Sequence, residues 1–79
     1  MAFKVARGLV LRTTTALKVG HDRIVAGTRV KAILGVNRTM LKVKIQDPRY
    51  PKLRGEWLTT SFENVMKAGR SWPRAGFHA

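Results

Sequence analysis

The chain has 79 residues, and its 16 Lys and Arg residues against four Asp and Glu give a net charge of +12 at pH 7. A chain of this length folds as one domain with a modest core. It contains no cysteine, which excludes disulfides and thiolate metal sites. Its apolar runs are far shorter than the roughly 20 residues of a membrane span, and its N-terminus is unlike a signal peptide. We therefore expect a cytoplasmic protein without a membrane partner.

Two segments show the alternation of a half-buried strand. In residues 41–46, every second residue is apolar and the others are polar or charged, and residues 28–32 repeat this pattern. Glycine and asparagine within residues 34–40 favour a turn, so we predict an antiparallel hairpin. The charged side chains of both strands then share one face, namely Arg29, Lys31, Lys42 and Lys44.

Shorter strands are predicted on either side of this hairpin. Residues 17–19 and 23–25 flank a turn. Residues 56–59 follow a loop, 47–55, whose prolines cannot donate to a strand ladder. The stretch 3–12 fits a strand or a helical face, and we assign it as a strand because an internal glycine disfavours a helix by about 1 kcal/mol.

The C-terminal part begins with a capping box. The Thr60 side chain is placed to accept a hydrogen bond from the amide of Glu63, whose carboxylate reaches back. One or two helical turns are therefore predicted over 61–67. We expect residues 1–68 to form the domain and residues 69–79 to form a basic aromatic tail that is mobile or ordered by a partner.

This order of elements resembles an SH3-like small barrel. Residues 27–45 are similar to the KOW motif of ribosomal proteins and transcription elongation factors that contact RNA or DNA, although 38–40 stand where such modules usually keep a second glycine. The resemblance covers about half the chain. It implies a mostly-β fold, a single barrel of about five strands with one short C-terminal helical turn. A shared fold leaves the role open, so function is argued from the residues.

The cations on the hairpin face have no acidic neighbours. Like charges about 5 to 8 Å apart across paired strands destabilise the free protein, and phosphate binding relieves this repulsion and releases counterions. The alternative is a lysine-coated solvent face that protects a sheet edge from aggregation. The following loop adds more cations, so we predict a site for DNA or RNA, made of Arg29, Lys31, Lys42, Lys44, Arg49, Lys52 and Arg54 with the aromatic Tyr50.

The aromatic residues divide into candidate platforms and core. Tyr50 lies in the proline-rich loop, where its ring either stacks a base or folds back over the end of the barrel. Trp57 is expected in the core, since a small barrel needs a large ring inside. Trp72 in the tail, flanked by Arg70 and Arg74, either docks on a partner or closes the barrel, and we predict partner binding.

Catalysis has little support in the sequence. His21 and Asp22 are neighbours in a turn, so their side chains diverge. The two histidines and four carboxylates do not form a metal-binding pattern, and no phosphate-binding glycine loop occurs. We expect no enzyme activity, no cofactor and no metal.

Two function classes remain open at this stage. The first is a nucleic-acid-binding module that grips the phosphate backbone through the strand face and loop. The second is a small protein-binding regulator or inhibitor that docks on an acidic surface of a transcription or translation machine. Composition does not separate them, because an acidic protein groove attracts the same charges.

Overall fold

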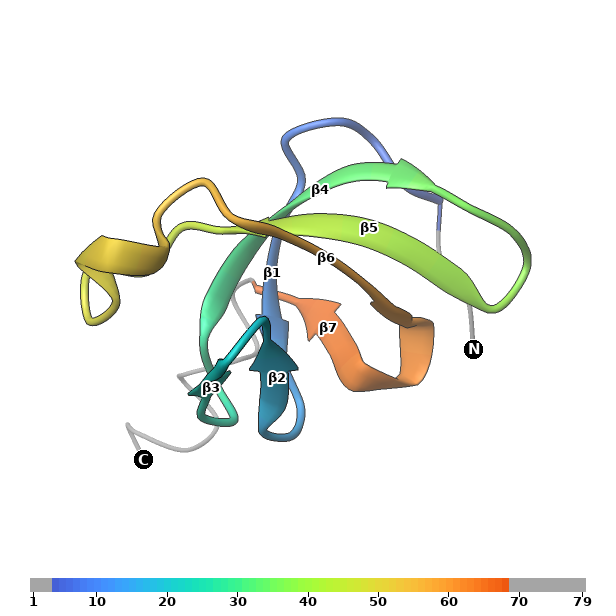
Figure 1. The fold of residues 1–79 in the computed structure, drawn as a ribbon. Coiled ribbons are helices and arrows are strands. Elements are labelled where there is room, and N and C mark those ends of the chain that lie inside the picture. The colour runs from blue at the N-terminus through green and yellow to red at the C-terminus, as the bar shows by residue number, and fades with distance from the viewer. Residues whose placement is uncertain (1–3, 69–79) are drawn as a thin grey trace, which may run out of the picture.

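The computed structural model describes residues 4–68, and within that range the chain is mostly β, with two 3-10 helices and no α-helix. The strands are β1 (Val10–Thr13), β2 (Leu17–Val19), β3 (Asp22–Ile24), β4 (Arg29–Gly35), β5 (Met40–Ile45), β6 (Trp57–Ser61) and β7 (Val65–Lys67). The 3-10 helices are η1 (Pro51–Leu53) and η2 (Phe62–Asn64). Five strands form an antiparallel sheet in the order β6-β5-β4-β1-β7, and β2 and β3 form a separate two-stranded sheet (Figure 1).

The central hairpin of β4 and β5 is confirmed. Lys31 lies directly opposite Lys44, so the two lysines share a face as the alternation predicts. The Asn37 side-chain oxygen accepts hydrogen bonds from the backbone nitrogens of Thr39 at 2.9 Å and Met40 at 3.0 Å. These hydrogen bonds to Asn37 stabilise the turn that sets the register of the hairpin.

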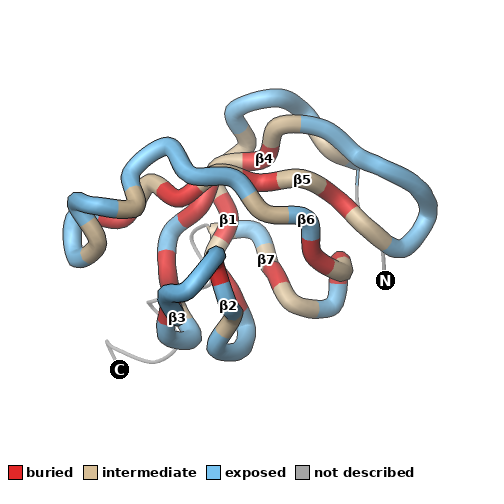
Figure 2. Tube along the Cα trace, in the orientation of Figure 1, coloured by how far each residue is buried: buried red, intermediate tan, exposed pale blue. Residues whose placement is uncertain are grey.

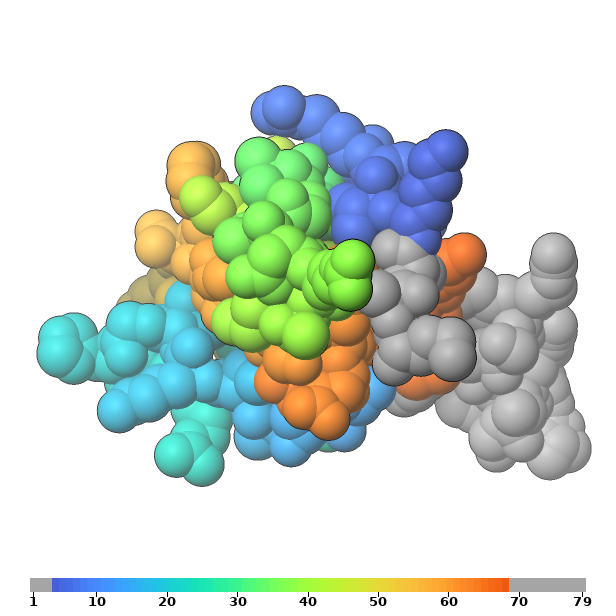
Figure 3. Space-filling view, turned by 90° about the vertical axis from the view of Figure 1, so that its right-hand side faces the viewer, coloured from blue at the N-terminus to red at the C-terminus, as the bar shows by residue number. Residues whose placement is uncertain are grey.

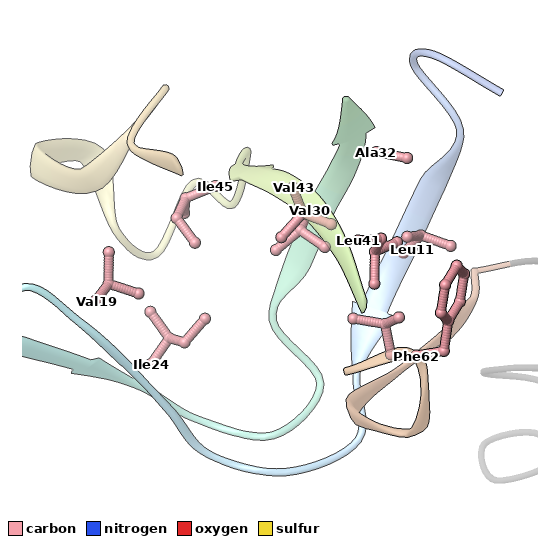
Figure 4. Packing of buried hydrophobic residues seen from close by; sticks show 10 residues of the cluster. Leu11, Val19, Ile24, Val30, Ala32, Leu41, Val43, Ile45 and Phe62 are labelled. Carbon is pink, nitrogen blue, oxygen red and sulfur yellow. The ribbon is translucent and has the colours of Figure 1, made fainter. Parts of the chain in front are cut away.

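The core lies between the inner face of the large sheet and the β2–β3 hairpin. Buried positions alternate with partly exposed ones along β5 (Figure 2). Val19 and Ile24 come from the small sheet and lie below Ile45, whereas Phe62 lies beside Leu11 at the other end (Figure 4). The buried apolar residues are Leu11, Val19, Ile24, Val30, Ala32, Leu41, Val43, Ile45, Phe62 and Val65.

Most of the predicted strands are present. The β2–β3 hairpin is confirmed, with the second strand one residue earlier than the predicted 23–25. The proline-rich segment 47–55 is irregular apart from η1, and β6 follows it as predicted, extended to Ser61.

The predicted N-terminal strand is wrong for residues 4–9, because β1 starts only at Val10. Gly8 has a φ of 87°, a left-handed conformation that interrupts an extended chain. The segment still follows β4, since the Gly8 nitrogen donates to the Ala32 carbonyl at 2.9 Å and the Ala32 nitrogen donates to the Leu9 carbonyl at 2.9 Å.

Of the one or two helical turns predicted over 61–67, a single 3-10 turn is present. Only η2 is helical, and the chain then extends as β7, in which Val65 lies opposite Thr13 of β1. Pairing with β1 and burial of Val65 outweigh the local capping signal. The cap residue itself is Ser61, whose hydroxyl accepts from the Glu63 nitrogen at 3.3 Å.

Thr60, the residue predicted to cap the helix, is buried on the core side of β6. Its hydroxyl accepts a hydrogen bond from the Asn64 side-chain amide at 3.0 Å. The Thr60 hydroxyl therefore has its hydrogen-bond partner at the far end of η2, and it does not cap a helix N-terminus.

A buried carboxylate, Asp47, holds the start of the 47–55 loop against the sheet. It accepts hydrogen bonds from the Arg29 nitrogen at 3.0 Å and the Arg49 nitrogen at 2.9 Å, and the Arg49 guanidinium Nη2 lies at 2.8 Å. The guanidinium and these two amides hold the pKa of Asp47 well below its ordinary value, against the opposing effect of burial.

Asp47→Asn should lower the free energy of unfolding at neutral pH by about 1–3 kcal/mol, because it weakens hydrogen bonds to a buried charged group. Since the folded-state pKa is lowered, the carboxylate contributes its stability above the unfolded pKa and loses it as the pH falls. The difference between wild type and variant should therefore be constant down to about pH 4 and shrink below it.

Denaturant unfolding at several pH values measures this difference. Glu56→Gln, at an exposed carboxylate, is the matched control and should change stability little. A difference for Asp47→Asn that is as large near about pH 2.5 as at neutral pH would contradict the assignment.

Candidate nucleic-acid interface

The outer face of the five-stranded sheet carries a row of cations. Residues that alternate with the core on β1, β4 and β5 point away from it. Arg12 lies opposite Arg29, and Lys31 lies opposite Lys44. We call this surface the basic face. It consists of the outward cations of the three strands and of two neighbouring cations that line hollows beside them, and its members are Arg7, Arg12, Arg29, Lys31, Lys42, Lys44 and Arg54.

In the part of the chain that the structure describes, cations are paired directly across strands at three places. Besides the two pairs on the basic face, Lys18 lies opposite Arg23 in the small sheet. Like charges directly opposite each other destabilise a sheet by up to about 1 kcal/mol relative to neutral pairs. The free protein is therefore less stable than a version with an acid at one position of each pair.

The first hollow on the basic face has a volume of about 390 Å³ and includes an aromatic ring. Arg7, Lys31, Lys44 and Trp57 line it, and it is open to solvent. The N-terminal segment that carries Arg7 lies beside the tip of the β4–β5 hairpin, where Val5 is 3.7 Å from the Cβ position of Gly35 (Figure 3).

Two further hollows continue along the sheet. The second, of about 460 Å³, is lined by Arg29 and Arg54, and the third, of about 470 Å³, by Arg12, Arg29 and Arg49. Among the described residues that line the three hollows, the only carboxylate is Asp47. Its ion pair with Arg49 neutralises it, so the basic face keeps its excess of positive charge.

Arg49 was predicted to contact phosphate, but its guanidinium is bound to Asp47. Nε donates to that carboxylate at 3.1 Å, and Nη2 also donates to the Gly27 carbonyl at 3.4 Å. The ion pair raises the pKa of Arg49. The structure therefore gives Arg49 a role in holding the loop.

Arg12 is also tied to the fold, although it lies on the basic face. Its Nη1 donates to the Gly27 carbonyl at 3.1 Å, and its Nε is a buried donor without a hydrogen-bond partner among the described residues. Sequence reasoning missed Arg12, although it alternates with Leu11 and Thr13, both fully buried.

Tyr50 lies half-buried and is part of the fold. Its ring packs against the core, and its hydroxyl accepts a hydrogen bond from the Val25 nitrogen at 3.0 Å. Of the two alternatives for this residue, the geometry supports the one in which the ring folds back. Lys52, in η1 beside it, lines a different hollow with Asp22 and Arg23.

Trp57 is not in the core, which corrects the sequence prediction. Its side chain is 60% exposed and lies opposite Lys44 at the start of β6. The Lys42 Nζ lies 4.7 Å from the centroid of the ring, a cation–π contact. The inward positions of β6 are instead taken by Leu58 and Thr60. The predicted strand ended at residue 59, and once it is extended to Ser61 the alternation of side chains places Trp57 on the outer face.

The sheet thus brings together five of the predicted cations: Arg29, Lys31, Lys42, Lys44 and Arg54. It adds Arg7, Arg12 and Trp57, which sequence reasoning did not include in the site. The predicted tail residues Arg70, Trp72 and Arg74 lie outside the described residues.

Between residues 4 and 68, no three or more His, Asp or Glu side chains are grouped as metal ligands would be. No helix in the same range is long and apolar enough to cross a membrane. Comparison with protein families, curated proteins and solved structures finds no match to this chain.

Lys44→Glu should stabilise the free protein by a few tenths to about 1 kcal/mol, because it replaces a repulsive pair with Lys31 by an attractive one. The melting temperature should rise by about 2–8 °C. Lys18→Glu, which makes the same change opposite Arg23, is the matched control with the same net charge and should give a similar rise. Thermal unfolding at low salt measures both, and a loss of stability in Lys44→Glu would contradict the observed pairing.

Proposed function

We propose that this protein is a non-enzymatic nucleic-acid-binding module that grips the phosphate backbone of DNA or RNA through the basic face. The observation that carries the proposal is the directly opposed pair Lys31 and Lys44, beside the pair Arg12 and Arg29. The carboxylate that lines the hollows beside them, Asp47, is paired with Arg49. Such a surface destabilises the free protein and is stabilised by an anionic partner. The mostly-β architecture is compatible with an SH3-like module, which we propose as its fold class.

A linear chain of phosphates suits the layout of these cations. Residues two apart along a strand, such as Lys42 and Lys44, are separated by about 6.6 Å, and opposed residues by about 5 Å. The row runs across β5, β4 and β1, because Lys44 faces Lys31 and Arg29 faces Arg12. Long flexible stems let these cations follow a backbone without a fixed base sequence.

The alternative partner is an acidic protein surface, as for a regulator or inhibitor of a transcription or translation machine. An exposed tryptophan among cations favours nucleic acid, because a ring face can take a base as well as a phosphate neighbour. The two partners also differ in how binding depends on salt and on the polymer offered.

Binding to nucleic acid should weaken steeply with salt. If six phosphates are neutralised, log affinity against log salt should have a slope of about −5 on duplex DNA and about −4 on a single strand. Fluorescence anisotropy with labelled oligonucleotides of mixed sequence, from about 50 to 300 mM salt, measures the slope. Lys44→Gln should reduce it by about 1, while Lys18→Gln on the small sheet should leave it unchanged.

Poly-L-glutamate of the same charge serves as the competitor for the protein-binding alternative. We expect it to compete weakly, since flexible carboxylates lack bases and bridging phosphates. A salt slope shallower than about −2, or no binding at low salt, would contradict the nucleic-acid proposal. Equal binding of poly-L-glutamate and DNA would favour the acidic protein surface.

A further inference from the structure

We infer that the basic face stacks an unpaired base on Trp57 and holds the flanking phosphates with Arg7, Lys31 and Lys44. Single-stranded nucleic acid is then its preferred ligand. This inference rests on the proposed function, and adds to it a contact that is independent of charge. It is carried by the position of one aromatic ring and of the hollow beside it.

The core does not use the Trp57 ring, whose one cation–π contact among the described residues is with Lys42 on the outer face. At 60% exposure it is the most exposed of the large hydrophobic side chains in the described range. Leu58 and Thr60 supply the inward contacts of β6, and β6 is an edge strand of the sheet, with β5 as its one neighbour. A residue with high strand preference and no large ring, such as threonine, would keep the strand pairing, because backbone groups make it.

The hollow beside Trp57 is suited to a flat group with attached negative charge. Its volume of about 390 Å³ falls within the usual range for small-molecule sites, about 300–1,000 Å³. The Lys42 Nζ lies over the ring, 4.7 Å from its centroid, and Lys42 is not among the residues that line the hollow. Its long flexible stem lets the ammonium group move aside for a base. Cations from three segments, Arg7, Lys31 and Lys44, surround the same space.

Apart from the terminal pair of a duplex, only an unpaired base can present its face to this ring. In a duplex each base is stacked between neighbours and shows only its edge in the grooves. Extruding it costs a few kcal/mol, whereas a single strand needs no such step. Stacking on Trp57 therefore contributes to single-strand binding and not to duplex binding, while the phosphate contacts contribute to both.

The test compares the wild type with Trp57→Thr on two probes, an oligothymidylate of about 20 nucleotides and a mixed-sequence duplex of the same length. We expect the substitution to weaken single-strand binding by roughly 5- to 150-fold, the range for loss of one stacked base. Duplex binding should change by less than about twofold. Trp57→Phe keeps a ring and should restore most of the single-strand affinity.

The matched control is Val25→Thr, which makes a similar change at another exposed apolar residue, outside the basic face. It should leave binding to both probes unchanged. Melting curves of all variants establish that each is folded, and the 60% exposure of Trp57 predicts little loss of stability on its replacement.

A second measurement uses the wild-type ring directly. The chain has two tryptophans, so Trp72→Phe leaves Trp57 as the single indole fluorophore. A base stacked on the indole quenches its emission, so oligothymidylate should quench it strongly and saturably. Duplex DNA and poly-L-glutamate should quench it weakly at concentrations that saturate binding.

The outcomes separate the two proposals. If the wild type binds both probes with the expected salt slope but Trp57→Thr weakens neither, or both equally, the stacking inference is overturned and phosphate binding stands. A duplex bound at least about tenfold more tightly than the single strand would also overturn it. If the wild type binds neither probe at low salt, the proposed function itself fails. Quenching by poly-L-glutamate equal to that by oligothymidylate would assign the platform to a protein ligand.

Discussion

The register between β4 and β5 is the constraint on which both the core and the basic face depend. Side chains alternate with a period of two, so the pairing that buries Val30 opposite Ile45 also sets Lys31 opposite Lys44 on the other face. A slip of one residue would turn the lysines into the core and the apolar residues into water. The strength of the apolar contacts therefore holds like charges together that would otherwise separate.

The sequence was sufficient to predict the parts in which local pattern and burial agree. The alternation in β5, the β2–β3 hairpin and the proline-rich loop were all predictable, because each has a period or turn residues of its own. The shared face of Lys31 and Lys44 followed from the same alternation. These features need no knowledge of distant contacts beyond the pairing of one hairpin.

The errors arose where a distant partner decides the local structure. Residues 65–67 form a strand because β1 has a free edge beside them, and a capping pattern does not reveal that edge. Trp57 was assigned to the core because large rings usually are buried, although its pairing with Lys44 places it outside. The loop residues Arg49 and Tyr50 look like ligand contacts until Asp47 and the Val25 amide are seen as their partners. The nature of the ligand was not predictable from charge alone, because an acidic protein surface attracts the same cations as nucleic acid.

The conformation of Gly8 also has a consequence for the basic face. Gly8 lines the hollow beside Trp57, and a Cβ added to it would meet no atom within 4 Å, so space does not demand glycine there. Its φ of 87° does demand it, because other residues are strained in that region. The backbone turns at Gly8, directly after Arg7. The direction in which the Arg7 side chain leaves the chain therefore depends on the conformation of this glycine. The geometry of the hollow thus depends on backbone conformation as well as on charge. A substitution at position 8 would change the direction of the Arg7 side chain while every charged residue of the site stays the same.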